Sequence, residues 1–172
     1  EEHALLVNGV VHALRCDLNR DDTSFPAVLT EWRQNGGWRM RAFKVVATND
    51  DYPEFAVGCA AFAGMAVAHW WDQDWGRHHS EPFATLLGPR GFDDMDDHIT
   101  GDILNLTLEE SLKISGTINN CVQAALGLIR HEGIEAQTAT GFYALARCYS
   151  VLFRIGVSIE LKRLGYKKQG IR

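Results

Sequence analysis

The sequence lacks the short motifs that identify most enzymes and nucleotide-binding proteins. It contains no Gly-x-Ser-x-Gly nucleophile elbow and no local pairing of a cysteine with a histidine, so neither arrangement for nucleophilic catalysis is indicated. It has no glycine-rich phosphate fingerprint, because Asn35-Gly36-Gly37 is typical of a turn rather than of a nucleotide-binding loop. DNA- and RNA-binding motifs are absent, and the net charge of −5 argues against nucleic acid as a partner.

The four cysteines are too dispersed to form a recognisable metal or redox motif. Cys16, Cys59, Cys121 and Cys148 include no Cys-x-x-Cys pair. Cys59 and Cys148 have apolar neighbours, and a thiol in such surroundings behaves as a small hydrophobic group. This usage predicts reduced cysteines and a cytoplasmic or other reducing compartment, although an even number of cysteines also allows two disulfide bridges.

Low-complexity runs and internal repeats are also missing from the 172 residues. Hydrophobic residues make up 46% and charged residues 23%, and this average composition predicts a single domain over 1–172 with one core. The charges are uneven, because residues 55–110 carry 10 acidic and 2 basic side chains, and residues 111–172 carry 9 basic and 3 acidic ones. Either these regions pair within the fold or face water, or the basic end meets an anionic partner.

The most distinctive stretch that is present lies between residues 54 and 75, where residues 55–71 contain no Asp, Glu, Lys or Arg. Small residues recur in it at a spacing of four: Ala56, Ala60, Gly64 and Ala68. On a helix this spacing forms one narrow ridge that another backbone can approach closely. We therefore predict a buried central helix over 52–76.

A membrane span through residues 55–71 is the alternative interpretation of the same stretch. A spanning helix needs about 20 predominantly apolar residues, and this run is slightly shorter. Aromatic residues flank the run at both ends, as in an interfacial belt, whereas His69 opposes insertion. The composition favours a core helix and leaves membrane association as the alternative.

The residues before the central helix have the patterns of short strands. Asn8-Gly9 separates two apolar runs within residues 4–14, and Asn-Gly is the preferred dipeptide of a tight hairpin turn. Residues 26–47 repeat this logic around Gly36 and Gly37, with apolar and charged residues alternating after the turn. The two hairpins predict a small antiparallel sheet within residues 1–49 that packs on the central helix.

The residues after the central helix predict loop and then helix. Residues 77–106 are acidic and rich in turn-forming residues, with one short helix from Pro82 to Leu87. Thr107 and Glu110 have the spacing of a capping box, which starts a helical region over 107–165 before a basic tail at 166–172. Its apolar stripe includes Leu108, Leu112, Val122 and Leu126. A second helix follows from about 136 to 164, although the β-branched residues 151–161 leave a strand as the alternative there. The whole pattern predicts an α+β fold.

An aspartate-rich segment is the first candidate for chemistry. Asp93, Asp94 and Asp97 with His98 gather carboxylates that repel one another, and a divalent metal ion would relieve that repulsion. Such an ion would be the cofactor of a metal-dependent hydrolase in which it activates a water molecule. A solvated acidic loop is the alternative interpretation.

Three other histidines form a second candidate metal site at the end of the central helix. They are His69, His78 and His79, and acidic residues lie between and after them. Two histidines and a carboxylate are a ligand set for Zn²⁺ or Fe²⁺. The alternative is that a histidine beside tryptophans takes part in packing.

A cluster of aromatic residues gives the prediction of function. Trp70, Trp71 and Trp75 with Arg77 have the composition of an interface anchor. Because this cluster is present and no complete catalytic set is, we predict a non-enzymatic interaction or accessory subunit that binds a protein partner or a second copy of itself. A metal-dependent hydrolase and a single-span subunit of a membrane complex are the alternatives.

Overall fold

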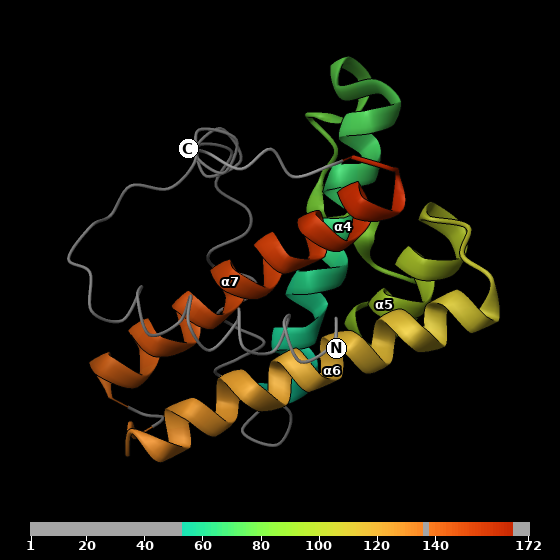
Figure 1. Ribbon diagram of the computed structural model, residues 1–172. Helices are drawn as coiled ribbons and strands as arrows, with labels where there is room; N and C mark the ends of the chain where they lie inside the picture. Colours follow the sequence, from blue (N-terminus) through green and yellow to red (C-terminus); the bar gives the residue numbers. More distant parts are fainter. Residues whose placement is uncertain (1–52, 136–137, 167–172) are drawn as a thin grey trace, which may run out of the picture.

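The computed structural model describes residues 53–135 and 138–166, and these residues are mostly helical (Figure 1). The three long helices are α4 (Pro53–His78), α6 (Leu108–His131) and α7 (Ala139–Arg163). Four short elements connect α4 to α6: η1 (Phe83–Leu86), η2 (Phe92–Asp94), α5 (Met95–His98) and η3 (Ile99–Ile103). In Figure 1, α7 (orange to red) crosses α4 (teal to green), and α6 crosses the lower part of α4.

The prediction of an α+β fold is wrong for the part of the chain that the structure describes. Residues 53–135 and 138–166 contain no strand, and their only β-type pairing is an isolated bridge between Gly88 and Gly91. The central helix packs on two other helices, which cover its apolar surface in place of a sheet. The two predicted hairpins, in residues 4–14 and 26–47, lie outside the described residues.

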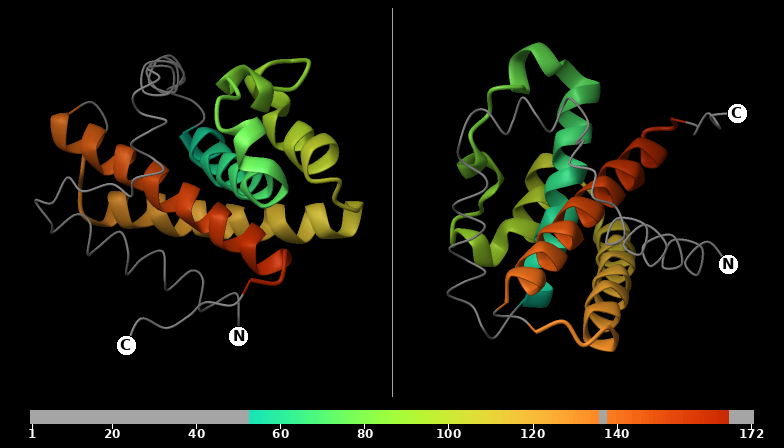
Figure 2. Two further views of the ribbon diagram at one scale, coloured as in Figure 1. Left: turned by 90° about the horizontal axis from the view of Figure 1, so that it is seen from above. Right: turned by 90° about the vertical axis from the view of Figure 1, so that its left-hand side faces the viewer.

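The crossing of α4 and α7 brings two backbones into direct contact, and Figure 2 shows it from two further sides. A Cβ atom built on Gly156 of α7 would overlap the backbone carbonyl of Ala61. A Cβ atom on Gly64 of α4 would likewise overlap the carbonyl oxygen of Phe153. Glycine alone permits this approach, so Gly64 of the predicted ridge of small residues serves the packing of α4 on α7.

Threonine side chains fix the first turns of α6 and α7. The predicted capping box is present, because Glu110 N–H donates to Thr107 Oγ1 (3.3 Å) and Thr107 N–H donates to Glu110 Oε2 (2.9 Å). These interactions with Thr107 lower the pKa of Glu110. At the start of α7, Thr138 Oγ1 accepts from Gly141 N–H (3.0 Å), and the helix therefore begins three residues later than the sequence predicts.

The buried face of α6 includes the later part of the predicted apolar stripe, with Val122 and Leu126, but not its first residues. Leu108 and Leu112 are 77% and 65% exposed, whereas burial on α6 begins only at Ile118. The buried residues of this helix are Ile118, Cys121, Val122, Ala125, Leu126 and Leu128. The first turns of α6 are thus only partly covered, with Ile114 packed against the core while Leu108 and Leu112 face solvent. Helical periodicity alone does not show where a neighbour ends.

The connection between α4 and α6 contributes to the core instead of forming only a loop. Leu86, Met95, Ile99 and Leu104 are buried, and they join the cluster of apolar side chains around α4. The short helix predicted near Pro82 is present as the 3₁₀ turn η1. These short elements cover one side of α4, and they leave its opposite side to α7.

One helix among the described residues, α7, is long and apolar enough to cross a membrane, by the criteria of length and composition alone. A core helix of a soluble protein meets the same criteria. The predicted span, residues 55–71, lies in α4, where the side chains from Ala56 to Ala68 are buried by the rest of the protein. The membrane alternative stays a prediction.

Candidate functional site

The end of α4 that carries the tryptophans is interrupted by a kink at Asp74. Its φ of −165° and ψ of 88° are not helical. Asp74 Oδ1 accepts a hydrogen bond from Arg77 N–H (3.1 Å), as the side chain of a helix N-cap does. The kink separates Trp75 and Arg77 from the regular part of α4, so the four predicted partner-binding residues do not share one helical face.

Trp70 belongs to the core rather than to an open surface. Its side chain is buried, and its ring stacks on the ring of His78 with centroids 5.5 Å apart and 6° between the planes. Stacked aromatic pairs of this kind add to the stability that burial provides. A partner could therefore reach only the neighbouring aromatic residues.

Trp71 and Tyr166 form an exposed pair of rings, which we call the aromatic surface. Trp71 is 49% exposed and Tyr166 is 48% exposed, and their ring centroids lie 5.9 Å apart. Tyr166 O–H donates a hydrogen bond to Asp72 Oδ1 (2.6 Å), and this bond raises the pKa of the Tyr166 phenol. Because this hydrogen bond ties Tyr166, three residues beyond the end of α7, to α4, the Tyr166 ring is held beside Trp71 on the surface.

Trp75 and Arg77 lie beyond the kink, next to the aromatic surface in the sequence. Trp75 is partly exposed, and its ring centroid is 6.3 Å from that of His79. Arg77 is exposed. The structure thus leaves Trp71, Trp75 and Arg77 accessible among the predicted partner-binding residues, and it adds Tyr166.

The buried carboxylate of Glu160 connects α7 to α4, six residues before Tyr166 of the aromatic surface. Glu160 has no exposed surface, and it accepts hydrogen bonds from Arg163 Nε (2.7 Å), from Arg163 Nη2 (2.6 Å) and from His69 Nδ1 (3.0 Å). Gln73 Nε2 donates to the other ring nitrogen of His69 (2.9 Å). The Glu160 carboxylate raises the pKa of Arg163. Both oxygens of Glu160 and both ring nitrogens of His69 are therefore hydrogen-bonded, and the cluster links the two helices.

The side chains of the aspartate-rich segment are not gathered around a common site. Asp94 is buried, where its Oδ1 accepts from Arg90 N–H (3.2 Å) and its Oδ2 lies 3.6 Å from Arg90 Nε. His98 uses both ring nitrogens, with Nδ1 2.7 Å from Asp102 Oδ2 and Nε2 3.1 Å from the carbonyl oxygen of Thr85. The remaining predicted ligands, Asp93 and Asp97, are exposed. The structure gives these residues local roles in holding the turns before and around α5.

The three histidines of the second predicted metal site are likewise occupied separately. His69 bonds to Glu160, and His79 Nδ1 lies 2.9 Å from the carbonyl oxygen of Gly76. His78 stacks on Trp70, and its buried Nδ1 is 3.5 Å from the nearest carboxylate oxygen, too far for a good hydrogen bond. Within residues 53–135 and 138–166, no three His, Cys, Asp or Glu side chains are grouped to hold a metal ion. The divalent-metal cofactor therefore stays a prediction, and the described residues do not provide a grouped set of ligands for it.

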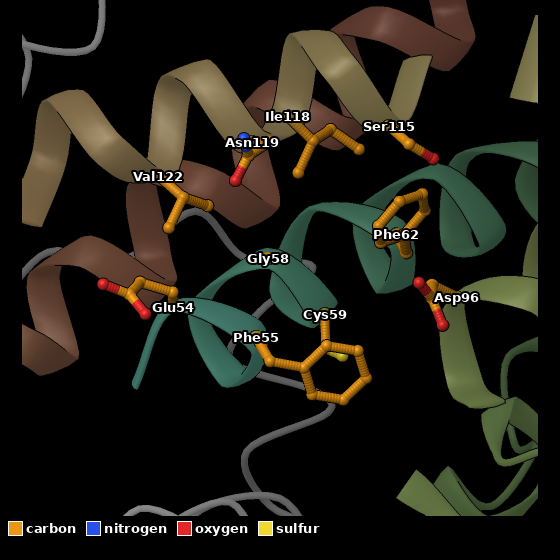
Figure 3. A pocket seen from close by; sticks show the side chains of 10 residues that line it. All are labelled: Glu54, Phe55, Gly58, Cys59, Phe62, Asp96, Ser115, Ile118, Asn119 and Val122. Atoms are coloured by element: carbon orange, nitrogen blue, oxygen red, sulfur yellow. The ribbon is translucent and has the colours of Figure 1, made fainter. Parts of the chain in front are cut away.

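A groove of about 340 Å³ lies between α4, α5 and α6 (Figure 3), and sequence reasoning did not identify it. We call it the α4–α6 groove. Its lining is mostly apolar, and Phe55, Phe62 and Ile118 supply much of it. The acidic side chains of Glu54 and Asp96 complete it at opposite ends of the view. No local motif marks such a groove, because its walls come from three separate segments.

The described cysteines are not suited to nucleophilic chemistry. Cys59, Cys121 and Cys148 are buried with free thiols. Burial raises the pKa of Cys148 to about 12, and it also raises the pKa values of the other two thiols. These thiols remain protonated near neutral pH, and they pack as small hydrophobic groups.

Comparisons with known proteins add no further guide to function. No protein-family model, curated protein or solved structure matches this chain. Its function must therefore be inferred from its own side chains and their arrangement. The aromatic surface and the α4–α6 groove are the two features of the described residues that we consider as sites for a partner or a ligand.

Proposed function

We propose that this protein is a non-enzymatic interaction subunit that binds a protein partner through the aromatic surface. One observation carries the proposal: the rings of Trp71 and Tyr166 are about half exposed and lie 5.9 Å apart. Large aromatic side chains dominate the binding energy of protein interfaces. Two adjoining rings that remain open to solvent are therefore the part of this structure best suited to a partner.

The hydrogen bonding around these rings supports the proposal. Tyr166 is held by its bond to Asp72, and α4 is held against α7 by the buried Glu160 cluster. Side chains that are ordered before binding lose less conformational entropy when a partner arrives. Trp75 and Arg77 extend the accessible groups beyond the kink, and both residue types are enriched among the strongest interface contacts.

A non-enzymatic role is supported by the state of the groups that catalysis would use. His69 and His98 have both ring nitrogens within hydrogen-bonding distance of other side chains or backbone, and His79 faces a backbone carbonyl. The described thiols are buried with raised pKa values. These engaged groups serve the fold, and none of them is placed beside an activated nucleophile.

The proposal is tested by comparing the Trp71→Ala variant with the wild-type protein. Partners would be recovered from an extract of the source cells on immobilised wild-type protein, and affinity for each recovered partner would then be measured with purified components. We expect Trp71→Ala to weaken binding by about thirtyfold or more, because truncating a central interface residue removes about 2 kcal/mol. Size-exclusion chromatography with light scattering would identify a second copy of the chain as the partner.

Leu112→Ala is the matched control for this experiment. Leu112 is also apolar and exposed, but it lies on α6, outside the aromatic surface. Its substitution should leave both the affinity and the fold unchanged. If Trp71→Ala and Leu112→Ala bind every partner as well as the wild type does, the aromatic surface is not the binding site.

A further inference from the structure

The α4–α6 groove is lined by apolar side chains from two helices and by a few polar groups. Phe55, Cys59 and Phe62 project from α4, and Ile118 and Val122 face them from α6 (Figure 3). Ser115 and Asn119 add a hydroxyl and an amide from α6. A mostly apolar groove with a few polar groups is the usual composition of a small-molecule site, and its volume is near the lower end of the usual range, about 300 to 1,000 Å³.

The two carboxylates of the groove differ in their partners. Glu54 Oε1 accepts a hydrogen bond from Arg130 Nη2 (3.1 Å), so its charge is paired. Asp96 forms no ion pair with any cationic side chain among the described residues. The neighbouring acidic side chains of Asp94 and Asp102 are paired with Arg90 and with a histidine. Within residues 53–135 and 138–166, Asp96 is thus the acidic group of the groove that has no cationic side chain paired with it.

The surroundings of Asp96 favour a cation beside it. Partial burial raises the pKa of the Asp96 carboxyl. Backbone hydrogen bonds at Asp97 and Asp96 offset part of this shift, and the nearby carboxylates of Asp97 and Asp94 add to it. A positive charge in the groove would offset both the lost solvation and the repulsion between these groups. The ring of Phe62 lines the same groove, and an aromatic face also attracts a cation.

We propose that the α4–α6 groove binds a small organic amine, whose ammonium group pairs with Asp96 and whose apolar body lies against Phe55, Phe62 and Ile118. The charge of Asp96 selects a cation, and the apolar walls select an organic ion over a hydrated metal ion. The α6 hydroxyl and amide of Ser115 and Asn119 are placed to receive a polar substituent. This proposal rests on no part of the aromatic surface, so it can stand or fall independently of the proposed function.

The experiment compares two probes of nearly the same shape that differ in charge. 2-Phenylethylammonium carries the ammonium group, and 2-phenylethanol is its neutral counterpart. Each probe is titrated into the protein at neutral pH while the backbone amide signals of Gly58, Ile118 and Asn119 are followed by NMR. We expect the amine to bind with a Kd of about 1 mM or below, as befits a ligand of this size, and to shift these signals. We expect the alcohol to bind about tenfold more weakly, because it cannot form the charged hydrogen bond.

Two variants separate the pairing with Asp96 from a general effect of negative charge. Asp96→Asn keeps the shape of the side chain and removes its charge, and we expect it to raise the Kd of the amine about tenfold. Asp93→Asn is the matched control, because Asp93 is exposed, lies outside the groove lining and is not among the groups that shift the pKa of Asp96. We expect it to change the Kd by less than about twofold, because exposed charges are screened by salt.

A third variant tests the place of binding. A Cβ atom on Gly58 would lie 3.8 Å from a methyl carbon of Val122 and 3.9 Å from one of Ile118, so Gly58→Ala narrows the groove without a clash. We expect this variant to fold and to weaken the binding of both probes. The proposal is overturned if Asp96→Asn binds the amine as the wild type does, if the alcohol binds equally well, or if the shifted signals lie outside the groove.

Discussion

The central helix α4 meets its neighbours in two different ways. Toward α7 it is closed, because Gly64 leaves no room for a Cβ atom and the buried Glu160 accepts hydrogen bonds from His69 and Arg163. Toward α6 it is open, because Gly58 leaves ordinary van der Waals space and Asp96 has no cationic partner among the described residues. On the closed side, Glu160 is hydrogen-bonded to His69 and Arg163. On the open side, Asp96 has no such cationic partner among the described residues.

This difference distinguishes structural polar groups from functional candidates. A buried charge with a full set of hydrogen bonds holds two elements together, and removing one partner leaves the others unsatisfied. A partly buried charge without a partner raises the free energy of the folded state, and a ligand can relieve this. Substitutions on the two sides should therefore change stability in opposite directions.

The largest change in stability is expected from replacing Glu160 at the interface of α4 and α7. Replacing Glu160 with Ala removes the acceptor of Arg163 and His69 from a site with no exposed surface. We expect a loss of about 3 kcal/mol in the free energy of unfolding, because one partner of a buried pair is left without compensation. Urea denaturation followed by circular dichroism would measure it.

Glu132→Ala is the control for this prediction. Glu132 lies just after α6 and its nearest charged partner is His131, at 3.7 Å in an exposed pair. An exposed pair of this type contributes less than about 1 kcal/mol. Equal stability of the Glu160→Ala and Glu132→Ala variants would show that the cluster between α4 and α7 is not structural.

A smaller effect is expected from adding one methyl group at the helix crossing. In the Gly156→Ala variant the new Cβ atom meets the backbone of Ala61, and the two helices must separate. Overpacking of this kind costs about 1 to 3 kcal/mol. Alanine is also the better helix former by about 1 kcal/mol, so we expect a net loss of about 2 kcal/mol at most, read from the same denaturation curves.

Gly127 of α6 provides the matched comparison for Gly156. It is also within a helix, but a Cβ atom there would have no neighbour within 4 Å. Gly127→Ala should therefore stabilise the protein by up to about 1 kcal/mol through helix propensity alone. A gain in stability in both variants would mean that the crossing has room that the structure does not show.

The smallest effect is expected on the open side, and it depends on pH. Burial raises the pKa of Asp96 in the folded state, so the folded protein binds more protons than the unfolded chain between the ordinary carboxyl pKa and the raised one. Stability must then fall as the pH rises through this window. Asp96→Asn removes the titrating group, and we expect this variant to be the more stable one near neutral pH.

The advantage of Asp96→Asn should disappear on acidification. At a pH of about 3 or below, the carboxyl group is largely protonated in both states, and wild type and variant then carry nearly the same charge at this position. Thermal unfolding at a series of pH values would give the difference in Tm. A constant difference across the series would show that the charge of Asp96 is not the cause.

Local sequence signals predicted the parts of the fold that depend on nearby residues. The capping box of Thr107 and Glu110 needs only a spacing of three, and it is present. The central apolar stretch is found as α4, within two residues of the predicted bounds. The α+β prediction failed because the sequence does not show that α4, α6 and α7 cover one another, and Leu108 and Leu112 are exposed for the same reason.

The candidate sites depended almost entirely on contacts between distant residues. A partner-binding role of Trp71 was predicted from the cluster of tryptophans around it. Its neighbour Tyr166 was assigned to a basic tail, because no local sequence signal connects Tyr166 to α4. The aspartates and His98 are adjacent in the sequence and looked like a metal site, yet Asp94 and His98 bond to Arg90 and Thr85 instead. Sequence proximity does not fix the direction of side chains, and a groove built from three segments has no local signature.

The close approach of Gly64 to Phe153, and of Gly156 to Ala61, also affects how the protein folds. Gly64 and Phe153 are 89 positions apart (153 − 64), and α6 lies between them in the sequence. Joining the ends of so long a segment costs about 4 kcal/mol in chain entropy, before the packing of α7 on α4 provides any stabilisation. A helical protein usually folds quickly through local contacts, but here the tightest helix pair is a distant one. The docking of α7 on α4 is therefore expected to limit the folding rate, long after each helix can form by itself.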